Sequence, residues 1–247
     1  MTEKPFFTLE KQELIQIFSS LNNMTEDPIK FHMDINGISI RTMDPSHVAL
    51  IDISIDEKSF IDFDTKDQEI DFYLNVNESL KIIKSLDKGK IKCIIKRDHI
   101  ELIQNGFITQ LKNLNIDDST NCPLPKIHYN SKFVFSKNTE IKQILKKFES
   151  NTDYITFEVI DQNLEFSGSS DQGICKMNFT NDDNVQIEST NDSRTKYSLE
   201  YINPFLKSIN KDNKLIFEYS QNKPLRISQK IGLYGVIHYY LAPKVES

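Results

Sequence analysis

The chain has 247 residues, of which 36 are acidic and 30 basic, so its formal net charge at pH 7 is −6 and its pI is about 5.5. Hydrophobic residues make up 38% and charged residues 27% of the sequence, which is typical of a folded globular protein and excludes disordered and collagen-like chains. The acidic total argues against a uniformly basic nucleic-acid-binding protein. It does not exclude a basic surface that is segregated from an acidic remainder.

The sequence has no signal for secretion, membrane insertion, metal binding or cofactor binding. Its apolar runs are only a few residues long, and residues 1–4 contain no hydrophobic core of a signal peptide. The cysteines, Cys93, Cys122 and Cys175, stand far apart and lack the spacing of a zinc site. No P-loop or dinucleotide fingerprint occurs. We therefore expect an intracellular protein with free thiols, no metal and no cofactor.

The first half of the chain is predicted to contain two helices separated by antiparallel strands. Residues 8–21 carry an apolar stripe at the helical period, and residues 77–86 carry another, with Asn77 as a candidate N-cap residue. Alternation of apolar and polar residues predicts half-buried strands at residues 29–35, 49–55 and 70–76. The dipeptide Asn36-Gly37 predicts a two-residue hairpin turn after the first of these strands.

The second half repeats this pattern. Helical stripes recur at residues 139–148 and 198–209, where Ser198 is a candidate N-cap residue and Pro204 is expected to shorten or kink the helix. An alternating run at residues 154–160 is followed by a turn and a second extended run, as in the first half. The first helices and strands correspond at an offset of 126 or 127 residues, and the second helices at 123. We therefore predict a duplicated unit.

A polar segment that ends with two prolines, residues 116–126, separates the two halves. It predicts an extended connector, so we place an N-terminal domain at residues 1–117, the connector at 118–126 and a C-terminal domain at 127–247. Leu124 is framed by the two prolines. It either docks a partner or pins the connector to its own domain, and the sequence leaves both roles open.

Basic residues are concentrated on three of the four predicted helices. Residues 77–86, 139–149 and 198–211 each carry a net charge of +1 and residues 8–22 carry −1, so the four together carry +2 and the rest of the chain −8. On the second and third helices, lysines three or four residues apart share the face opposite the apolar stripe. One such face alone is an ordinary solvated surface, but the recurrence predicts a common basic surface.

The most distinctive string is Met43-Asp44-Pro45-Ser46-His47-Val48-Ala49-Leu50. One alternative is a hydrolase that uses Asp44, Ser46 and His47, because these are the residue types of a hydrolytic triad. Adjacent residues cannot readily supply the geometry of a nucleophile, a base and an orienting group, and no oxyanion-hole glycine accompanies them. The other interpretation is a proline-containing turn between two strands, so we do not expect an enzyme.

Three segments resemble the proliferating cell nuclear antigen family of DNA sliding clamps, and the form is closest to the archaeal members. They are the string at residues 43–50, the connector around Leu124, and residues 239–246, which read Tyr-Tyr-Leu-Ala-Pro-Lys-Val-Glu. The resemblance spans essentially the whole chain. It implies an α+β fold of two tandem similar clamp domains, each with two helices packed on antiparallel sheets. It also implies a ring-shaped trimer whose helices line a central hole.

The resemblance further implies three functional surfaces. A client peptide would insert into a hydrophobic pocket formed by Met43, His47, Val48, Leu50, Leu124, Pro224, Tyr240, Ala242 and Pro243. Inner-helix lysines would contact the DNA backbone without reading the base sequence at Lys81, Lys84, Lys146 and Lys207, and helix geometry adds Lys142. Subunits would meet where residues 107–114 pair with residues 173–179 of a neighbour, with the apolar candidates Ile108, Leu111, Ile174 and Met177. These four could equally be ordinary core residues.

The implied function is that of a DNA polymerase sliding clamp, a processivity factor that encircles double-stranded DNA as a homotrimer. It would tether DNA polymerase, flap endonuclease and DNA ligase and would be loaded by a clamp loader, in the cytoplasm or nucleoid of an archaeal-type cell. The alternative is a subunit of a heterotrimeric or checkpoint-type clamp. In the first helix, Gln16 and Asn23 stand where many members have lysine, so its share of the DNA contact is open. Glu165 replaces the lysine that carries ubiquitin-type modification in eukaryotic members.

Overall fold

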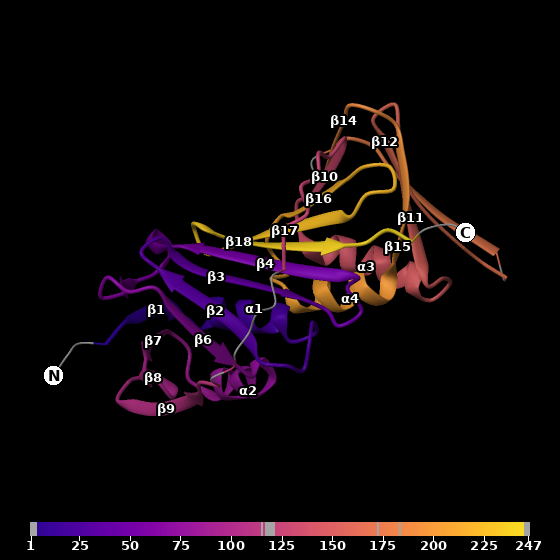
Figure 1. The fold of residues 1–247 in the computed structure, drawn as a ribbon. Coiled ribbons are helices and arrows are strands. Elements are labelled where there is room, and N and C mark those ends of the chain that lie inside the picture. The colour runs from indigo at the N-terminus through magenta and orange to yellow at the C-terminus, as the bar shows by residue number, and fades with distance from the viewer. Residues whose placement is uncertain (1–3, 115, 117–121, 172, 183, 245–247) are drawn as a thin grey trace. The chain divides into compact units, whose positions relative to one another are not determined.

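The computed structural model describes residues 4–114, 116, 122–171, 173–182 and 184–244, and it divides into two units. The first unit comprises Met1–Pro123 with Lys230–Ile237, and the second comprises Leu124–Gln229 with His238–Ser247. In each unit, helices pack on antiparallel strands (Figure 1). No helix in the described ranges is long and apolar enough to cross a membrane.

The first unit is built from two sheets and the helices α1 (Lys11–Leu21) and α2 (Val76–Ser85). Its strands are β1 (Phe6–Glu10), β2 (Ile29–Asp34), β3 (Gly37–Met43), β4 (Ala49–Asp56), β5 (Asp62–Asp64), β6 (Ile70–Leu74), β7 (Lys90–Ile95), β8 (His99–Gln104) and β9 (Phe107–Lys112). A single 3-10 turn, η1 (Glu57–Ser59), follows β4. One set of strands has the order β5-β1-β7-β8-β9 and the other β4-β3-β2-β6.

The second unit repeats these elements with the helices α3 (Asn138–Glu149) and α4 (Leu199–Ser208). Its strands are β10 (Ser131–Phe135), β11 (Tyr154–Ile160), β12 (Asn163–Ser170), β13 (Gly173–Phe179), β14 (Val185–Ser189), β15 (Ser193–Ser198), β16 (Leu215–Tyr219), β17 (Leu225–Ile231) and β18 (Gly235–Leu241). The end of β17, the start of β18 and the turn between them, Lys230–Ile237, are counted with the first unit. They follow the orders β14-β10-β16-β17-β18 and β13-β12-β11-β15, which match the orders of the first unit strand for strand. The predicted duplication is therefore confirmed.

The repeat extends to the contacts that hold each helix pair together. Lys11, the first residue of α1, donates from Nζ to the carbonyl of Lys84 at 2.9 Å and to the carbonyl of Leu86 at the end of α2. Asn138, the first residue of α3, lies 127 positions later and donates from Nδ2 to two carbonyls at the end of α4, each at 3.2 Å. Both side chains satisfy carbonyl groups that a helix end leaves without a partner.

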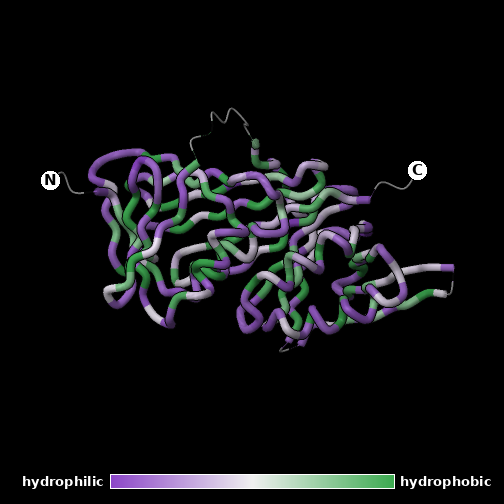
Figure 2. The backbone as a smooth tube through the Cα atoms, turned by 90° about the horizontal axis from the view of Figure 1, so that it is seen from below, coloured by the Kyte–Doolittle hydropathy of each residue, from purple (hydrophilic) through white to green (hydrophobic). Residues whose placement is uncertain are grey.

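Phenylalanine supplies most of the aromatic packing in a chain that has no tryptophan. Phe18 of α1 stacks on Phe31 of β2 with the ring centroids 5.4 Å apart, and Phe31 stacks on Phe72 of β6 at 5.1 Å. In the second unit, Phe133 of β10 stacks on Phe217 of β16 at 4.7 Å. Each pair contributes about 0.5–1.5 kcal/mol beyond its buried area. Figure 2 shows hydrophobic and hydrophilic residues alternating along extended parts of the chain, as expected for strands that bury one face.

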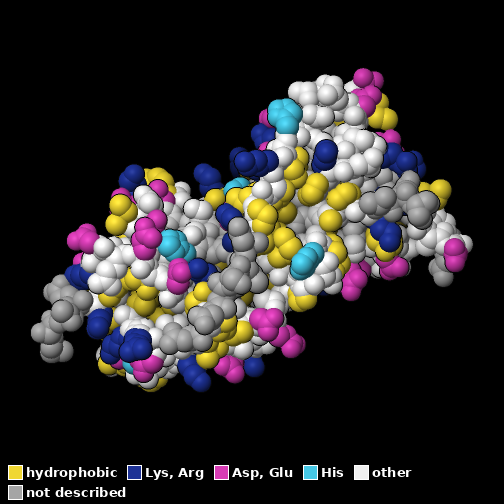
Figure 3. Space-filling view, viewed as in Figure 1, with side chains coloured by type: hydrophobic (Ala, Val, Ile, Leu, Met, Phe, Trp, Pro, Cys, Tyr) yellow, Lys and Arg dark blue, Asp and Glu magenta, His cyan; other side chains and the backbone are white. Residues whose placement is uncertain are grey.

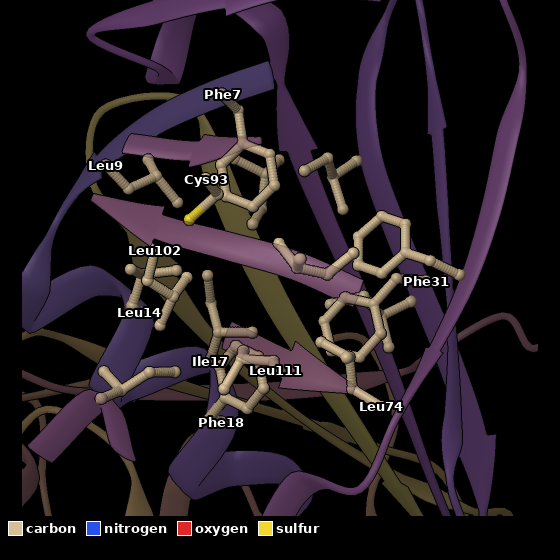
Figure 4. A pocket seen from close by; sticks show the side chains of 16 residues that line it. Phe7, Leu9, Leu14, Ile17, Phe18, Phe31, Leu74, Cys93, Leu102 and Leu111 are labelled. Atoms are coloured by element: carbon tan, nitrogen blue, oxygen red, sulfur yellow. The ribbon is translucent and has the colours of Figure 1, made fainter. Parts of the chain in front are cut away.

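A cavity of about 20 Å³ lies in the core of the first unit (Figure 4). It is lined by apolar side chains of α1, α2 and the surrounding strands, and by the thiol of Cys93. The space is enough for one water molecule, but the lining offers no polar partners, so it is a dry packing gap rather than a ligand site. Burial raises the pKa of the Cys93 thiol, which makes this cysteine unreactive.

The start of the first helix was predicted wrongly. α1 begins at Lys11 and not at residue 8, because residues 8–10 belong to β1. Phe7 and Leu9 are both buried on one face of that strand, so the period of two applies up to Glu10. The apolar stripe begins only at Leu14, so it does not fix the residue at which the helix starts.

The helix caps were predicted in part. The N-cap residue of α2 is Asn75 and not Asn77, because its Oδ1 accepts a hydrogen bond from the Glu78 amide at 3.0 Å. Ser198 occupies the N-cap position of α4, as predicted, but makes no side-chain cap hydrogen bond. Pro204 lies inside α4 rather than ending it.

The turn after β2 is shifted by one residue from the prediction. Asp34 pairs with Gly37, so the turn residues are Ile35 and Asn36, and Gly37 is the first residue of β3. The Asp34 carboxylate accepts a hydrogen bond from the Asn36 amide at 2.8 Å, which closes the turn locally. Among residues 34–37, only Gly37 has a positive φ, of 137°.

We expect Gly37→Ala to destabilise the first unit strongly. An added Cβ would lie 1.9 Å from the Ile55 carbonyl oxygen, a backbone atom fixed by the pairing of β3 with β4. Gly89→Ala is the matched control, because Gly89 also has a positive φ, of 112°, but open space around its Cα. We expect a loss of unfolding free energy of about 3 kcal/mol or more at Gly37 and about 1 kcal/mol at Gly89, measured by chemical denaturation. Equal losses would show that the close approach has no effect.

Candidate functional site

Asp44 organises the turn between β3 and β4. Its Oδ1 accepts hydrogen bonds from the amides of Val48 and Ala49 at 2.7 and 2.5 Å, and its Oδ2 accepts from the Ser46 amide at 3.0 Å. The residue is buried, and His47 takes a positive φ of 58° within the turn. The carboxylate thus takes the place of the strand carbonyls or water molecules that would otherwise accept hydrogen bonds from these amides.

This geometry opposes the hydrolase alternative. Both oxygens of the Asp44 carboxylate are occupied by backbone amides, so the group is not free to orient His47 as a general base. Ser46 and His47 are exposed on the turn. Within the ranges that the structure describes, no three His, Cys, Asp or Glu side chains are placed to hold a metal ion.

The first-unit residues predicted for the client pocket lie on this turn and its flanking strand ends. Met43 and Val48 are half-buried, and His47 is exposed. Leu50 is only 3% exposed, so it supports the turn from the core rather than forming an open surface. The structure therefore brings these four residues together and offers Met43, His47 and Val48 to solvent.

The connector is held to the first unit by Arg41 of β3. Arg41 Nε donates to the Asp52 carboxylate of β4 at 2.8 Å, and its Nη1 donates to the Cys122 carbonyl at 3.3 Å. Cys122 precedes the Pro-Leu-Pro segment by one residue. Leu124 is half-buried and begins the second unit. The rest of the predicted connector, residues 118–121, lies outside the described residues.

The second-unit residues of the predicted pocket range from half-buried to buried. Tyr240 of β18 is 7% exposed, and Pro224, Ala242 and Pro243 are half-buried. The domain boundaries predicted at residues 117 and 127 and the pocket itself stay predictions.

Tyr129 and Arg226 form a contact that the sequence did not predict. The guanidinium of Arg226 lies 5.0 Å from the ring centroid of Tyr129, and it is paired with the Glu218 carboxylate at 2.7 Å. Among the described residues the buried Tyr129 hydroxyl has no hydrogen-bond partner, and burial raises its pKa. Such an orphaned hydroxyl is suited to pair with an incoming peptide group. No spacing in the sequence marks Tyr129, because its partners lie about ninety residues later on β16 and β17.

The predicted DNA-contacting lysines lie on the solvent side of their helices. The buried residues of α2 include Leu80 and Ile83, whereas Lys81 and Lys84 are exposed. On α3 and α4, Lys146 and Lys207 are likewise exposed opposite buried stripes. Lys142 differs, because it is half-buried, and burial together with the nearby charge of Lys211 lowers its pKa.

The lack of lysines on the open face of α1 has a structural counterpart. Lys11, the one lysine of that helix, is directed to the end of α2 and not to solvent. Gln16 is buried, and its amide donates to the Lys230 carbonyl at 3.1 Å. The polar side chains at these two positions of α1 therefore serve packing within the unit.

The predicted subunit contacts lie on two edge strands. β9 and β13 each end their strand orders and have one strand neighbour among the described residues. Ile108 is 56% and Ile174 73% exposed, and Met177 is half-buried. Leu111 is 3% exposed and lines the core cavity, so for this residue the core alternative is correct.

Comparison with known proteins assigns the family. A family model of the N-terminal domain of proliferating cell nuclear antigen matches residues 9–122, and one of its C-terminal domain matches residues 123–244. The chain belongs to the proliferating cell nuclear antigen family. It is 38% identical to the DNA polymerase sliding clamp of Nitrosopumilus maritimus and 34% identical to that of Cenarchaeum symbiosum, in each case over 97% of this chain and 98% of the relative.

Solved structures share the fold over the whole length. Proliferating cellular nuclear antigen from Entamoeba histolytica has a TM-score of 0.88 and 23% identity, covering 99% of this chain and 100% of that one. The A. fulgidus protein, solved with the C-terminal region of FEN-1 bound, has a TM-score of 0.87 and 18% identity, covering 98% and 99%. The predicted α+β fold of two tandem similar clamp domains is thereby confirmed.

Proposed function

We propose that this chain is a non-catalytic DNA polymerase sliding clamp of an archaeal-type cell. The observation that carries the proposal is the match over 97% of the chain to relatives that bear this name. The duplication and the turn at Asp44, whose carboxylate is occupied by backbone amides, agree with a scaffold rather than an enzyme. The protein would act with the replication and repair enzymes that work on duplex DNA.

The clamp would close as a homotrimer through its edge strands. Strand edges with exposed apolar side chains favour association. Pairing β9 of one subunit with β13 of the next would give hydrogen-bond partners to both edges and would cover their apolar side chains. Phe107 and Ile108 on β9 and Ile174 on β13 supply the apolar contacts. Three copies of such a head-to-tail contact form a closed ring if the rotation between subunits closes.

Lys81, Lys84, Lys146 and Lys207 would contact the phosphates of DNA inside this ring, and Lys142 would be a weaker contributor because it is half-buried. The four predicted helices carry +2 per chain while the rest carries −8, so positive charge would be concentrated where the helices meet DNA. Contacts to phosphate alone carry no base sequence information, and sliding requires this.

Client proteins would bind through a short peptide. The apolar side chains of Met43, Val48, Leu124 and Pro224, with Tyr129 and Tyr240, are suited to a hydrophobic and aromatic anchor. The A. fulgidus structure contains a FEN-1 segment. We therefore expect flap endonuclease, DNA polymerase, DNA ligase and a clamp loader as partners.

We expect Leu124→Ala to weaken binding of a flap-endonuclease client peptide by about 1–4 kcal/mol while leaving the ring assembled. The leucine is half-buried beside the connector prolines, so its truncation removes anchor area without opening a core. Ile160→Ala, at an exposed isoleucine of β11, is the control and should change nothing. Calorimetry measures the affinity, and unchanged affinity would place the pocket elsewhere. If the unmutated chain failed to raise polymerase processivity on primed circular DNA with a clamp loader present, the clamp proposal would be wrong.

A further inference from the structure

Three turns of the first unit meet at one place, and two of them expose large apolar side chains. Ile35 lies in the β2–β3 turn, and Leu233 and Tyr234 lie in the β17–β18 turn; these three residues are 64%, 78% and 58% exposed and are called the turn patch. The 3-10 turn η1 lies between them. In Figure 1 the yellow β17–β18 turn lies beside the turn that follows β4.

Hydrogen bonds fix the three turns to one another. The Glu57 amide donates to the Asn36 carbonyl at 2.9 Å, which joins η1 to the β2–β3 turn. The Tyr234 amide donates to Ser59 Oγ at 3.1 Å, which joins the β17–β18 turn to η1. All these bonds use backbone groups of the apolar residues or of their neighbours, so the patch is a preformed surface, and little ordering is needed to bind on it.

The duplicated unit shows that the fold does not require apolar residues at these turns. The turn that corresponds to Ile35-Asn36 is Asp161-Gln162 between β11 and β12. The turn that corresponds to the β17–β18 turn is Asn105-Gly106 between β8 and β9. Both counterpart turns consist of polar residues or glycine, although the exposed Ile160 and Phe107 adjoin them. In the turn patch the apolar side chains stand in the turns themselves, and the hydrogen bonds between the turns bring them together. Large exposed apolar groups at turns that are held rigidly are typical of an interaction surface.

Acidic residues surround the turn patch. Asp34, Asp56 and Glu57 flank the three turns, and the basic residues beside them are Lys58 in η1 and the exposed Lys230, three residues before Leu233. Asp62 adds a further exposed acid shortly after η1. Figure 3, seen from the same side as Figure 1, shows hydrophobic, acidic and some basic side chains in the part of the surface where these turns lie. An apolar centre with an acidic rim is complementary to an apolar side chain flanked by lysine or arginine.

We propose that the turn patch binds a short segment of a partner protein in which apolar side chains alternate with lysine or arginine. The apolar side chains would cover Leu233, Tyr234 and Ile35, and the basic side chains would face the acidic rim. This surface is separate in residues from the client pocket and from the helix lysines. It adds a second peptide-binding site to the chain.

The proposal can be tested with two labelled synthetic peptides of twelve residues that share leucine and phenylalanine at alternate positions. One peptide has lysine and the other glutamate at the remaining positions, and fluorescence anisotropy measures binding to the full-length protein. We expect the lysine peptide to bind at least tenfold more tightly than the glutamate peptide. The double variant Leu233→Ser, Tyr234→Ser should weaken the lysine peptide at least tenfold, since it keeps the backbone hydrogen bonds of the turn. Glu57→Lys should weaken the lysine peptide and strengthen the glutamate peptide.

Two matched variants separate this site from others. Ile160→Ser removes an exposed isoleucine in the second unit, and Leu124→Ala alters the client pocket; neither should change binding of the lysine peptide. Loss of binding in Leu124→Ala would show that the peptide occupies the client pocket. Equal binding of the two peptides would show that the acidic residues around the patch do not contribute to binding. Either result overturns the proposal. Light scattering of the double variant provides the last check, because a lower assembly mass than that of the unmutated protein would show that the patch contacts a second copy of this chain instead.

Discussion

Ile174→Asp should convert the proposed trimer into monomers. Ile174 lies on the edge strand β13 and is 73% exposed, so the substitution leaves the folded unit intact. In a ring its side chain would be covered by the β9 edge of the next subunit. An unpaired carboxylate in such a contact costs several kcal/mol, and a closed ring repeats the cost at every interface. The mass measured by light scattering after gel filtration should fall from three times the chain mass of 28.7 kDa to that mass alone.

The matched control is Ile160→Asp. Ile160 is 49% exposed at the end of β11, an inner strand of the same sheet, so it should leave the trimer unchanged. A second outcome distinguishes the homotrimer from the heterotrimeric alternative. If the unmutated chain elutes as a monomer and associates only with a paralogous chain, the clamp is heterotrimeric. If Ile174→Asp retains the trimer mass, the subunits meet through other strands.

Most of the fold could be predicted from the sequence because each element buries one face. Period-two alternation located β2, β4 and β6 within two residues at either end, and the apolar stripes located all four helices. Errors fell where a pattern does not reach the end of an element or where a side chain overrides the local preference. The apolar stripe of α1 begins only at Leu14, three residues after the helix starts, and Asp34 closes its turn one residue before the expected Asn-Gly position.

The residues of the candidate site could be predicted only where a sequence pattern also fixes which side chains are exposed. Exposed lysines follow from helix geometry, since the side opposite a buried stripe faces solvent. The role of Lys11 could not be predicted, because its acceptors lie more than seventy residues away at the end of α2. Leu111 shows the converse, because an apolar residue on an edge strand can point either to the core or to a neighbour. Only the packing of the folded unit decides between these two.

Among the side chains of the turn that carries Met43, His47 and Val48, the largest effect is expected of Asp44→Ala. This carboxylate accepts hydrogen bonds from the amides of Ser46, Val48 and Ala49, and the residue is buried. Each buried donor left without an acceptor costs about 1–3 kcal/mol, and water reaches some of them on a surface turn, so we expect a loss of about 2–4 kcal/mol in unfolding free energy. Chemical denaturation measures this loss.

The same substitution should weaken client-peptide binding, because Met43, His47 and Val48 are placed by the turn that Asp44 closes. Asp44→Asn retains one acceptor oxygen and should fall between the unmutated protein and alanine in both measurements. Ser46→Ala removes an exposed hydroxyl from the same turn and should change neither stability nor peptide affinity. If Ser46→Ala instead abolished an activity that Asp44→Asn also abolished, the three residues would be acting chemically, and the hydrolase alternative would return. A scaffold turn predicts a graded loss that follows the number of amide hydrogen bonds kept, and a catalytic triad predicts loss at every member.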